Sequence, residues 1–305
     1  MKKINFFGSI PAIVTPFKKN GDLDLAALEK LVDYQLRGGV DAIVVAGSTG
    51  EAATLSDEEF SKVIKTVVQK VSKSKIKVPV IAGASSNDTK RAVHLSKLAK
   101  DSGADALLHV TPFYNKPTPN GLMLHYKEIA KATDMPIIIY NVPGRTGSNV
   151  LPATILRIGR EVREVVAVKE ASGSLNQMME IIDGAANEGP KDFTVLSGDD
   201  ALTLPLIAVG GKGCISVVAN EAPKLFSNMV HLALQGKMKE AEKLHYELLP
   251  LMNVNFIESN PIPVKTAMAR MGLIEESFRL PLTSLEEKNR PIIEEVLKDL
   301  KLINR

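Results

Sequence analysis

One lysine is placed in the sequence as a chemically active residue would be. The stretch from Val165 to Gly173 reads as a short apolar strand that ends at Lys169 and opens into a polar loop. Lysine is rarely buried unless it is paired or has a function, and removing it from water favours the free amine. A free amine can attack a ketone and form a Schiff base. Lys169 is therefore a candidate nucleophile.

Other polar side chains follow neighbouring apolar runs. One run precedes Gly47-Ser48-Thr49-Gly50-Glu51, and another ends in Tyr140 with Arg145 five residues later. In barrels of parallel strands, chemistry collects at the carboxyl ends of the strands. Tyr140 and Lys169 would then be neighbours at one rim, where a phenol can move protons to and from a Schiff base. Ser48 could pass the proton on.

The alternation of side chains along a strand predicts which residues share the direction of Lys169. If Lys169 points into a barrel, Val165 and Ala167 should point inward as well. Val166 and Val168 should then face the surrounding helices.

Eight short apolar runs recur along the chain, and most are bounded by Gly, Pro, Asn or Asp, as buried parallel strands are. The runs are Ile10–Val14, Ala42–Ala46, Val78–Ala82, Ala106–Val110, Pro136–Tyr140, Val165–Lys169, Phe193–Ser197 and Gly213–Val217. Helical patterns lie between them, so we predict an α/β fold, a (β/α)8 TIM barrel. An open doubly wound sheet is less favoured, because no glycine-rich dinucleotide turn follows the first run.

Helix signals support this alternation and extend beyond it. Ser56 and Glu59 have the spacing of a capping box, Asn87 or Asp88 should cap the next helix, and Pro152 suits a first helical turn. After about residue 236 the strands stop, and helices are expected over Lys237–Phe256, Pro261–Met271 and Leu285–Leu300. We therefore expect a catalytic barrel over residues 1–235 and a C-terminal helical extension over 236–305.

Composition narrows the class of protein. The 305 residues are 45% hydrophobic, and the formal net charge of +3 is spread along the chain, which predicts no nucleic-acid or membrane partner. The start lacks the apolar core of a signal peptide, and no apolar run approaches the ~20 residues of a membrane helix. The single cysteine, Cys214, lies in an apolar run and should be a buried, unreactive thiol. We expect a soluble cytoplasmic protein.

Two further signals are weaker. Gly210-Gly211-Lys212-Gly213 is similar to a phosphate-binding loop, but it precedes a strand and so reads as a tight turn away from the chemical face. The five histidines show no short ligand spacing, so a metal-dependent mechanism is not expected.

Three motifs together resemble one family. Gly47-Ser48-Thr49-Gly50-Glu51, Tyr140-Asn141-Val142-Pro143 and Val168-Lys169-Glu170 resemble the dihydrodipicolinate synthase family, within the superfamily of pyruvate-dependent class I aldolases that also holds N-acetylneuraminate lyase. The resemblance runs from about Phe7 to the C-terminal helices. It implies a lyase of lysine and diaminopimelate biosynthesis that condenses pyruvate with L-aspartate-4-semialdehyde, without a metal or organic cofactor.

The resemblance also implies roles for single residues. Lys169 would form the Schiff base with pyruvate, Tyr140 would transfer protons, and Ser48 would be its relay partner. Tyr114 would complete the relay from a neighbouring subunit of a homotetramer, arranged as a dimer of dimers. The residues implied in substrate binding are Thr49 at the pyruvate carboxylate, Arg145 at the carboxylate of the second substrate, and Gly198 and Ile215 around the lysine.

Two positions depart from the family pattern. Family synthases usually carry threonine where this chain has Ser48, and the lyases usually carry serine, although both supply a hydroxyl. Arg91 stands where lysine-inhibited members often have glutamate, among the positions of Asp57, Phe60, Asn87 and Phe113. A cation there would repel the lysine ammonium, so we expect feedback inhibition by lysine to be weak or absent.

Two alternative functions follow from the same residues. An N-acetylneuraminate or 2-keto-3-deoxy sugar-acid aldolase would use the same pyruvate imine in the cleavage direction. Arg145 argues against it, because the planar arginine fork matches the carboxylate of an amino-acid semialdehyde. A non-catalytic barrel is disfavoured by the complete set of Ser48, Tyr114, Tyr140 and Lys169.

Overall fold

Eight parallel strands form the centre of the molecule. In this computed structural model, which describes residues 4, 6–187, 189–190 and 192–304, the strands are β1 (Gly8–Pro11), β2 (Ile43–Val45), β3 (Val80–Gly83), β4 (Ala106–Val110), β5 (Ile137–Asn141), β6 (Val165–Glu170), β7 (Thr194–Ser197) and β8 (Gly213–Ser216). The sheet order is β1-β8-β7-β6-β5-β4-β3-β2. The predicted TIM barrel with a helical extension is confirmed.

The ring of strands closes between β1 and β2 through a short contact. β1 pairs with β8 along its whole length, whereas on its other side Ala12 makes a single parallel bridge to Val44. The Ile13 amide also donates to the Val44 carbonyl at 2.9 Å. The apolar run expected at Ile10–Val14 is therefore divided, because its second half continues past the strand toward the rim.

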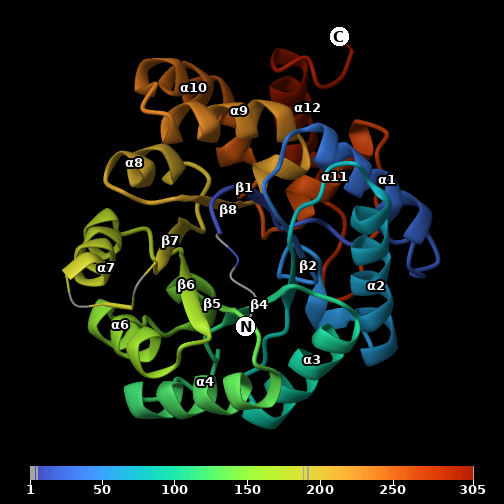
Figure 1. Cartoon of the computed structure of the whole chain (residues 1–305). Helices are drawn as coiled ribbons and strands as arrows, with labels where there is room; N and C mark the ends of the chain where they lie inside the picture. The colour runs from blue at the N-terminus through green and yellow to red at the C-terminus, as the bar shows by residue number, and fades with distance from the viewer. Residues whose placement is uncertain (1–3, 5, 188, 191, 305) are drawn as a thin grey trace.

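Helices surround the strands (Figure 1). They are α1 (Leu25–Arg37), α2 (Asp57–Lys73), α3 (Thr89–Asp101), α4 (Pro119–Thr133), α5 (Pro143–Thr146), α6 (Pro152–Glu161), α7 (Leu175–Asn187), α8 (Thr203–Ala208) and α9 (Pro223–Leu234). The capping box of Ser56 and Glu59 is present, Asp88 rather than Asn87 caps α3, and Pro152 begins α6. These local signals fix where each helix starts.

On β6, the predicted directions of the side chains are correct at the end of the strand and wrong at its start. Ala167 packs inside the barrel and Val168 packs against the helices, as expected. Val165, however, packs on the helix side and Val166 packs against the interior cluster. The register shifts between Ile137 and Ile138 on the neighbouring strand, so that Val166 is an extra residue. A bulge of this kind breaks the two-residue alternation.

The C-terminal helices pack on α8, α9 and each other, at the top of Figure 1. They are α10 (Met238–Val254), α11 (Ile262–Arg270) and α12 (Arg290–Asp299). The last helix starts later than the expected Leu285, with Pro291 in its first turn, where proline is favoured; the short turn η3 (Glu287–Asn289) precedes it. The boundary at 235/236 stays a prediction.

Two smaller expectations are confirmed. Cys214 is buried, and burial raises the pKa of its thiol. Gly210-Gly211-Lys212 connects α8 to β8 at the start of that strand, away from the carboxyl ends. No helix in the described part of the chain is both long and apolar enough to cross a membrane.

Two buried histidines lie between β4, α3 and α4. The Nε2 atom of His109 lies 3.1 Å from the Ser96 hydroxyl, and the Nδ1 atom of His125 lies 3.0 Å from the Thr89 hydroxyl. Burial lowers the pKa of His109 from 6.5 to about 3 and that of His125 to about 4. Both rings are therefore neutral in the folded protein near pH 7.

These histidines predict a loss of stability in mild acid. Below pH 6.5 the unfolded chain binds protons at both rings, whereas the folded protein does not bind them until the pH approaches 4. The stabilisation is thus complete above pH 6.5 and decreases as the pH falls. Each ring should contribute a slope on the order of 1 kcal/mol per pH unit. Urea unfolding at pH 7, 6 and 5 measures this slope.

The double variant His109→Gln/His125→Asn provides the control. Gln and Asn can replace the two hydrogen-bonding nitrogens but do not titrate. The double variant should lose stability less steeply than the wild type between pH 6.5 and 5. Equal slopes for the two proteins would contradict a role for these rings.

Candidate active site

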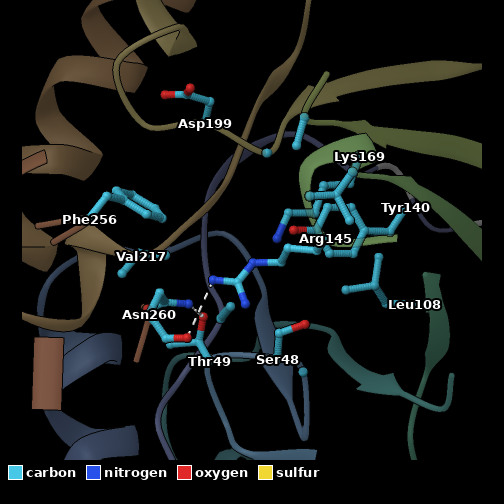
Figure 2. Close-up of a pocket in the computed structure, with 15 residues that line it drawn as sticks. Ser48, Thr49, Leu108, Tyr140, Arg145, Lys169, Asp199, Val217, Phe256 and Asn260 are labelled. Carbon is cyan, nitrogen blue, oxygen red and sulfur yellow. Dashed lines mark hydrogen bonds between the residues drawn. The ribbon is translucent and has the colours of Figure 1, made fainter. Parts of the chain in front are cut away.

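Tyr140 and Lys169 lie side by side at the carboxyl ends of β5 and β6. The strand register pairs the two residues, and their exposed fractions are 8% and 6%. The Lys169 Nζ atom lies 4.1 Å from the centroid of the Tyr140 ring, over its electron-rich face. The amine is thus held in a largely dry position beside a phenol (Figure 2).

A cavity of about 180 Å³ opens above this pair. Its walls come from the ends of most of the strands and from the C-terminal extension (Figure 2). The lining residues are Ala12, Gly47, Ser48, Thr49, Leu108, Tyr140, Val142, Arg145, Lys169, Ala171, Gly198, Asp199, Val217, Phe256 and Asn260. Given that a water occupies about 30 Å³ in the liquid, the cavity suits a small organic acid.

Gly198 leaves the room that Lys169 occupies. A Cβ atom at this position would lie 3.0 Å from the Lys169 Cε atom and 2.7 Å from the Ala171 Cβ atom. The first contact would force the lysine side chain to move, and the second would displace the residues that follow β6. Gly198 therefore sets the path of the lysine side chain.

The turn after β2 presents backbone donors to the cavity. Ser48 is exposed and Thr49 is buried, and both line the cavity. The Gly47 carbonyl accepts from the Gly50 amide at 3.0 Å, which tightens the turn. Among the described residues, no acceptor is found for the amides of Ser48 and Thr49. Successive free amides of this kind form a site for an anionic oxygen.

Arg145 and Asn260 link the barrel to the C-terminal extension across the cavity. The Arg145 Nη2 atom donates to the Asn260 carbonyl at 3.3 Å, and the Asn260 side-chain amide donates to the Thr49 hydroxyl at 2.9 Å (Figure 2). The Arg145 side chain is otherwise exposed, so its remaining donors can bind a carboxylate in the cavity.

Two predicted site residues lie outside this cavity. Ile215 is on β8, buried in the barrel interior, and is not among the lining residues. The Tyr114 side chain is 89% exposed and its backbone is left-handed, with φ 71°. Within a single chain, therefore, the structure does not bring Tyr114 to Lys169.

Nine of the fifteen lining residues were not predicted as site residues, and four of these nine come from the extension or follow β7 and β8. Asn260 and Phe256 come from the extension, and Asp199 and Val217 follow β7 and β8. Asn260 begins the stretch Asn260-Pro261-Ile262-Pro263-Val264-Lys265, which also resembles the synthase family, and that stretch was the one available signal for it. Phe256 and Val217 carry no chemical signal in the sequence, because they contribute only apolar surface.

A polar network holds the ends of β5 and β6 from the helix side. The buried Glu170 carboxylate accepts from the Asn141 side chain at 3.0 and 3.2 Å and from the Gln177 side chain at 3.1 Å. Its Oε1 atom also accepts from the Ser172 amide at 2.7 Å. Each of these donors would lose a partner without Glu170, so the network fixes the residues that follow Tyr140 and Lys169.

Acidic groups near the cavity differ in environment. Asp200 is buried, and burial raises the pKa of its carboxyl; its Oδ2 atom accepts from the Val217 and Val218 amides at 3.0 and 2.9 Å. Asp199 lines the cavity instead. Within the described ranges, no three His, Cys, Asp or Glu residues gather as ligands of a metal ion.

A second cavity of about 490 Å³ adjoins the first and shares Ser48, Tyr140 and Arg145 with it. Phe60, Arg91 and Phe113 line its far side. The Arg91 guanidinium forms a two-pronged ion pair with the Asp57 carboxylate, which lowers the pKa of Asp57 to about 2. The residues at the positions expected to bind an inhibitory lysine thus lie close to one another.

Comparison with known proteins identifies the chain's relatives. The model of the dihydrodipicolinate synthetase family matches residues 5–300. The 4-hydroxy-tetrahydrodipicolinate synthase of Maridesulfovibrio salexigens is 51% identical over 98% of this chain and 100% of its own length. That of Methanocaldococcus jannaschii is 50% identical over 98% of this chain and 100% of its own length.

The solved structures that match this chain include members of the same family. A structure of the dihydrodipicolinate synthase from Acinetobacter baumannii, complexed with pyruvate, superimposes with a TM-score of 0.93. The two sequences are 45% identical, and the match covers 97% of this chain and 99% of the other.

Proposed function

The chain belongs to the dihydrodipicolinate synthetase family, and we infer that it is a lyase that condenses pyruvate with L-aspartate-4-semialdehyde to 4-hydroxy-tetrahydrodipicolinate, in lysine and diaminopimelate biosynthesis. Its relatives at about 50% identity carry the name of this synthase over their full length. The observation that carries the chemistry is the buried Lys169 amine beside the Tyr140 phenol.

Lys169 would supply the covalent step. Its amine attacks the keto carbon of pyruvate, and water leaves to give an imine. Loss of a methyl proton gives an enamine, whose carbon attacks the aldehyde of the second substrate. The amino group of that substrate then attacks the imine carbon, which closes the ring and releases the lysine. The imine accepts the electron pair when the methyl proton leaves and again when the amino group attacks; in between, the enamine donates that pair to the aldehyde carbon, and the imine is re-formed.

Tyr140 would move the protons that these steps require. Its hydroxyl belongs to the residue paired with Lys169 across the strands, so it can exchange protons with the carbinolamine and the aldehyde oxygen. Ser48 lines both cavities with Tyr140 and would relay protons to it. Tyr114 would complete the relay from a second subunit, an assignment supported by its 89% exposure in the single chain.

The substrates would bind at opposite sides of the cavity. The free amides of Ser48 and Thr49 would hold the pyruvate carboxylate. Arg145 would bind the carboxylate of the semialdehyde, and Asp199, which also lines the cavity, has a charge suited to the semialdehyde ammonium. Gly198 would keep Lys169 in place, and Ile215 would close the barrel beneath it.

The sugar-acid aldolase alternative is not favoured, because the relatives are named as synthases. We propose the homotetramer, a dimer of dimers, as the assembly, with Tyr114 supplied across one interface. A cytoplasmic location and a functional barrel over residues 1–235 stay predictions.

Borohydride trapping tests the proposed chemistry. Reduction in the presence of pyruvate should leave a stable adduct on Lys169, which mass spectrometry of a digest locates. Lys169→Ala should give no adduct. Tyr140→Phe should retain pyruvate binding but slow turnover by about 10²–10⁴-fold, because proton transfer loses its phenol.

Two results would contradict the proposal. Absence of a pyruvyl adduct in the wild type would exclude the imine mechanism. Full turnover by Tyr140→Phe would remove the tyrosine from proton transfer. Comparing turnover on L-aspartate-4-semialdehyde and on N-acetylneuraminate assigns the second substrate.

Mixing two inactive variants tests the shared site. Tyr114→Phe and Lys169→Ala should each be nearly inactive alone. After subunit exchange, half of the dimers contain both chains, and each of these has one site with an intact Lys169 and Tyr114. About a quarter of the wild-type activity should return. No gain over the separate proteins would show that Tyr114 does not act across an interface.

Turnover in the presence of lysine tests the regulatory expectation. Arg91 is paired with Asp57 at the second cavity, so a lysine ammonium would meet a cation and a neutralised carboxylate. Physiological lysine concentrations should leave turnover nearly unchanged. Arg91→Glu should increase lysine binding in calorimetry, whereas Arg157→Glu, a surface change at another ion pair, should not. Strong inhibition of the wild type would refute the expectation.

A further inference from the structure

The turn that carries Ser48 and Thr49 is held from outside the barrel by the C-terminal extension. Asn260 binds the Thr49 hydroxyl, Lys265 binds the Glu51 carboxylate, and the Arg279 amide donates to the other Glu51 oxygen at 3.3 Å. These partners lie more than 200 residues further along the chain. The turn is therefore shaped by two distant parts of the sequence.

Lys265 is the most deeply buried member of this set. Its side chain is 0% exposed and that of Glu51 is 1% exposed, with 2.5 Å between the Nζ and Oε1 atoms. The Nζ atom also donates to the Thr15 carbonyl at 3.2 Å and lies 4.5 Å from the centroid of the Phe17 ring. The ammonium thus has a charged, a polar and an aromatic partner in one enclosed site.

Burying such a pair is not an efficient way to stabilise a fold. The desolvation of two charges largely offsets their attraction, and apolar residues of similar volume often serve as well. A buried pair does fix geometry, because each charge has one favourable partner. The Lys265–Glu51 pair should therefore serve mainly to hold Glu51 in one position.

Glu51 has an unusual backbone conformation at the end of the turn. Its backbone is left-handed, with φ 51°, which is uncommon for a residue with a side chain. Its amide donates to the Ser48 carbonyl at 3.1 Å, closing the turn on itself. On the preceding residue, the Gly50 carbonyl accepts from the Thr15 hydroxyl at 2.7 Å. Holding Glu51 thus holds Ser48.

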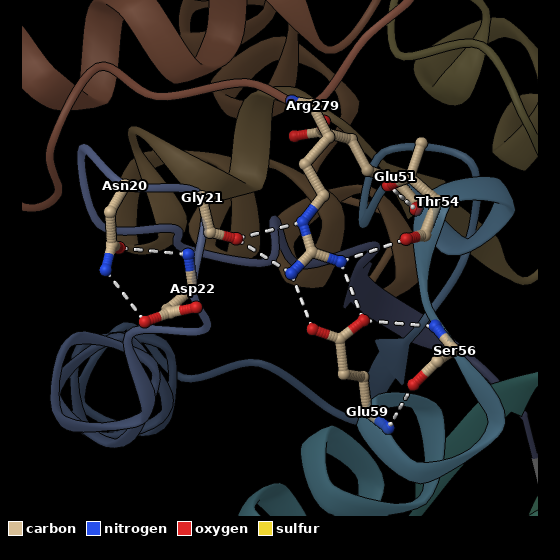
Figure 3. A network of polar contacts seen from close by, with 8 residues as sticks. All are labelled: Asn20, Gly21, Asp22, Glu51, Thr54, Ser56, Glu59 and Arg279. Carbon is tan, nitrogen blue, oxygen red and sulfur yellow. Dashed lines mark hydrogen bonds and ion pairs between the residues drawn. The ribbon is translucent and has the colours of Figure 1, made fainter.

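Arg279 holds the segment just beyond the turn (Figure 3). Its guanidinium donates to the Thr54 carbonyl at 2.9 Å and to the Gly21 carbonyl at 2.8 Å, and it pairs with Glu59 through both carboxylate oxygens. Glu59 in turn accepts from the Ser56 amide. The Arg279 side chain therefore fixes the far end of the segment, and Lys265 supplies the charged contact at the end that faces the cavity, beside the weaker contact of the Arg279 amide.

We propose that Lys265 is a positioning residue for pyruvate: through Glu51 it holds the Ser48 and Thr49 amides in the direction that binds the keto-acid carboxylate. This inference rests on the proposed function, since it assumes that those amides bind pyruvate. Lys265 itself does not line the cavity. Its effect should therefore appear in pyruvate binding and not in the chemistry at Lys169.

Borohydride trapping at increasing pyruvate concentrations tests the proposal without the second substrate. In Lys265→Met, the pyruvate concentration that gives half-maximal adduct should rise about tenfold, the loss expected for one well-placed hydrogen bond. Adduct formation at saturating pyruvate and the KM for L-aspartate-4-semialdehyde should change less than about twofold. Glu51→Gln, which weakens the same contact from the other side, should raise the half-maximal concentration severalfold.

Arg290→Met is the matched control. Arg290 forms a two-pronged ion pair with Glu276 in the same extension, so its loss should lower the unfolding temperature without changing pyruvate affinity. The proposal is overturned if Lys265→Met and Glu51→Gln lose stability but keep wild-type pyruvate affinity, or if Arg290→Met shifts that affinity equally. Should Lys265→Met fail to fold, the affinity of Glu51→Gln decides. A wild type that gives no adduct refutes the proposed function instead.

Discussion

The structure depends on burying the side chain of one lysine, Lys169, without giving it a carboxylate as an ion-pair partner. Lys169 and Lys265 are both buried, but only Lys265 has an ion pair among the described residues. The Glu51 carboxylate holds the Lys265 Nζ atom in one place, away from the residues that line the cavity. Lys169 instead lies over the Tyr140 ring, and its neighbour Glu170 points to the helix side, where amide donors satisfy it. The two buried lysines thus differ in their surroundings: one lies at the cavity beside a phenol, and the other is paired with a carboxylate behind the anion-binding turn.

The alternation of a strand supplies this separation. Lys169 and Glu170 are adjacent in sequence, yet successive side chains leave a strand on opposite faces. The bulge at Val166 lies below both residues, so the strand end keeps a regular pairing with β5 despite it. Asn141, which follows Tyr140, reaches Glu170 and thereby ties the ends of the two strands together. The geometry of the reactive pair is thus set by backbone pairing on one face and by a polar network on the other.

The sequence predicts the parts of this arrangement that depend on local chemistry. Buried parallel strands are apolar along their length, so all eight runs could be found, and capping residues marked helix starts such as Ser56. The adjacency of Tyr140 and Lys169 followed from counting strands. The directions of Val165 and Val166 could not be predicted, because a bulge depends on the neighbouring strand. The position of Asn260 at the cavity could not be predicted either, because it depends on how the C-terminal helices pack against the barrel.

Tyr114 and Asn260 illustrate the limit of local patterns in two ways. Asn260 reaches the cavity through packing within the chain, whereas Tyr114 points to solvent from a left-handed backbone. A large aromatic side chain in that position gains nothing from burial in a single chain, and its backbone conformation is unfavourable. A second subunit would supply the missing burial and offset that cost. The site therefore draws on the barrel for its nucleophile, on the extension for the shape of its anion-binding turn, and, in the proposed assembly, on a neighbour for its last proton-relay group.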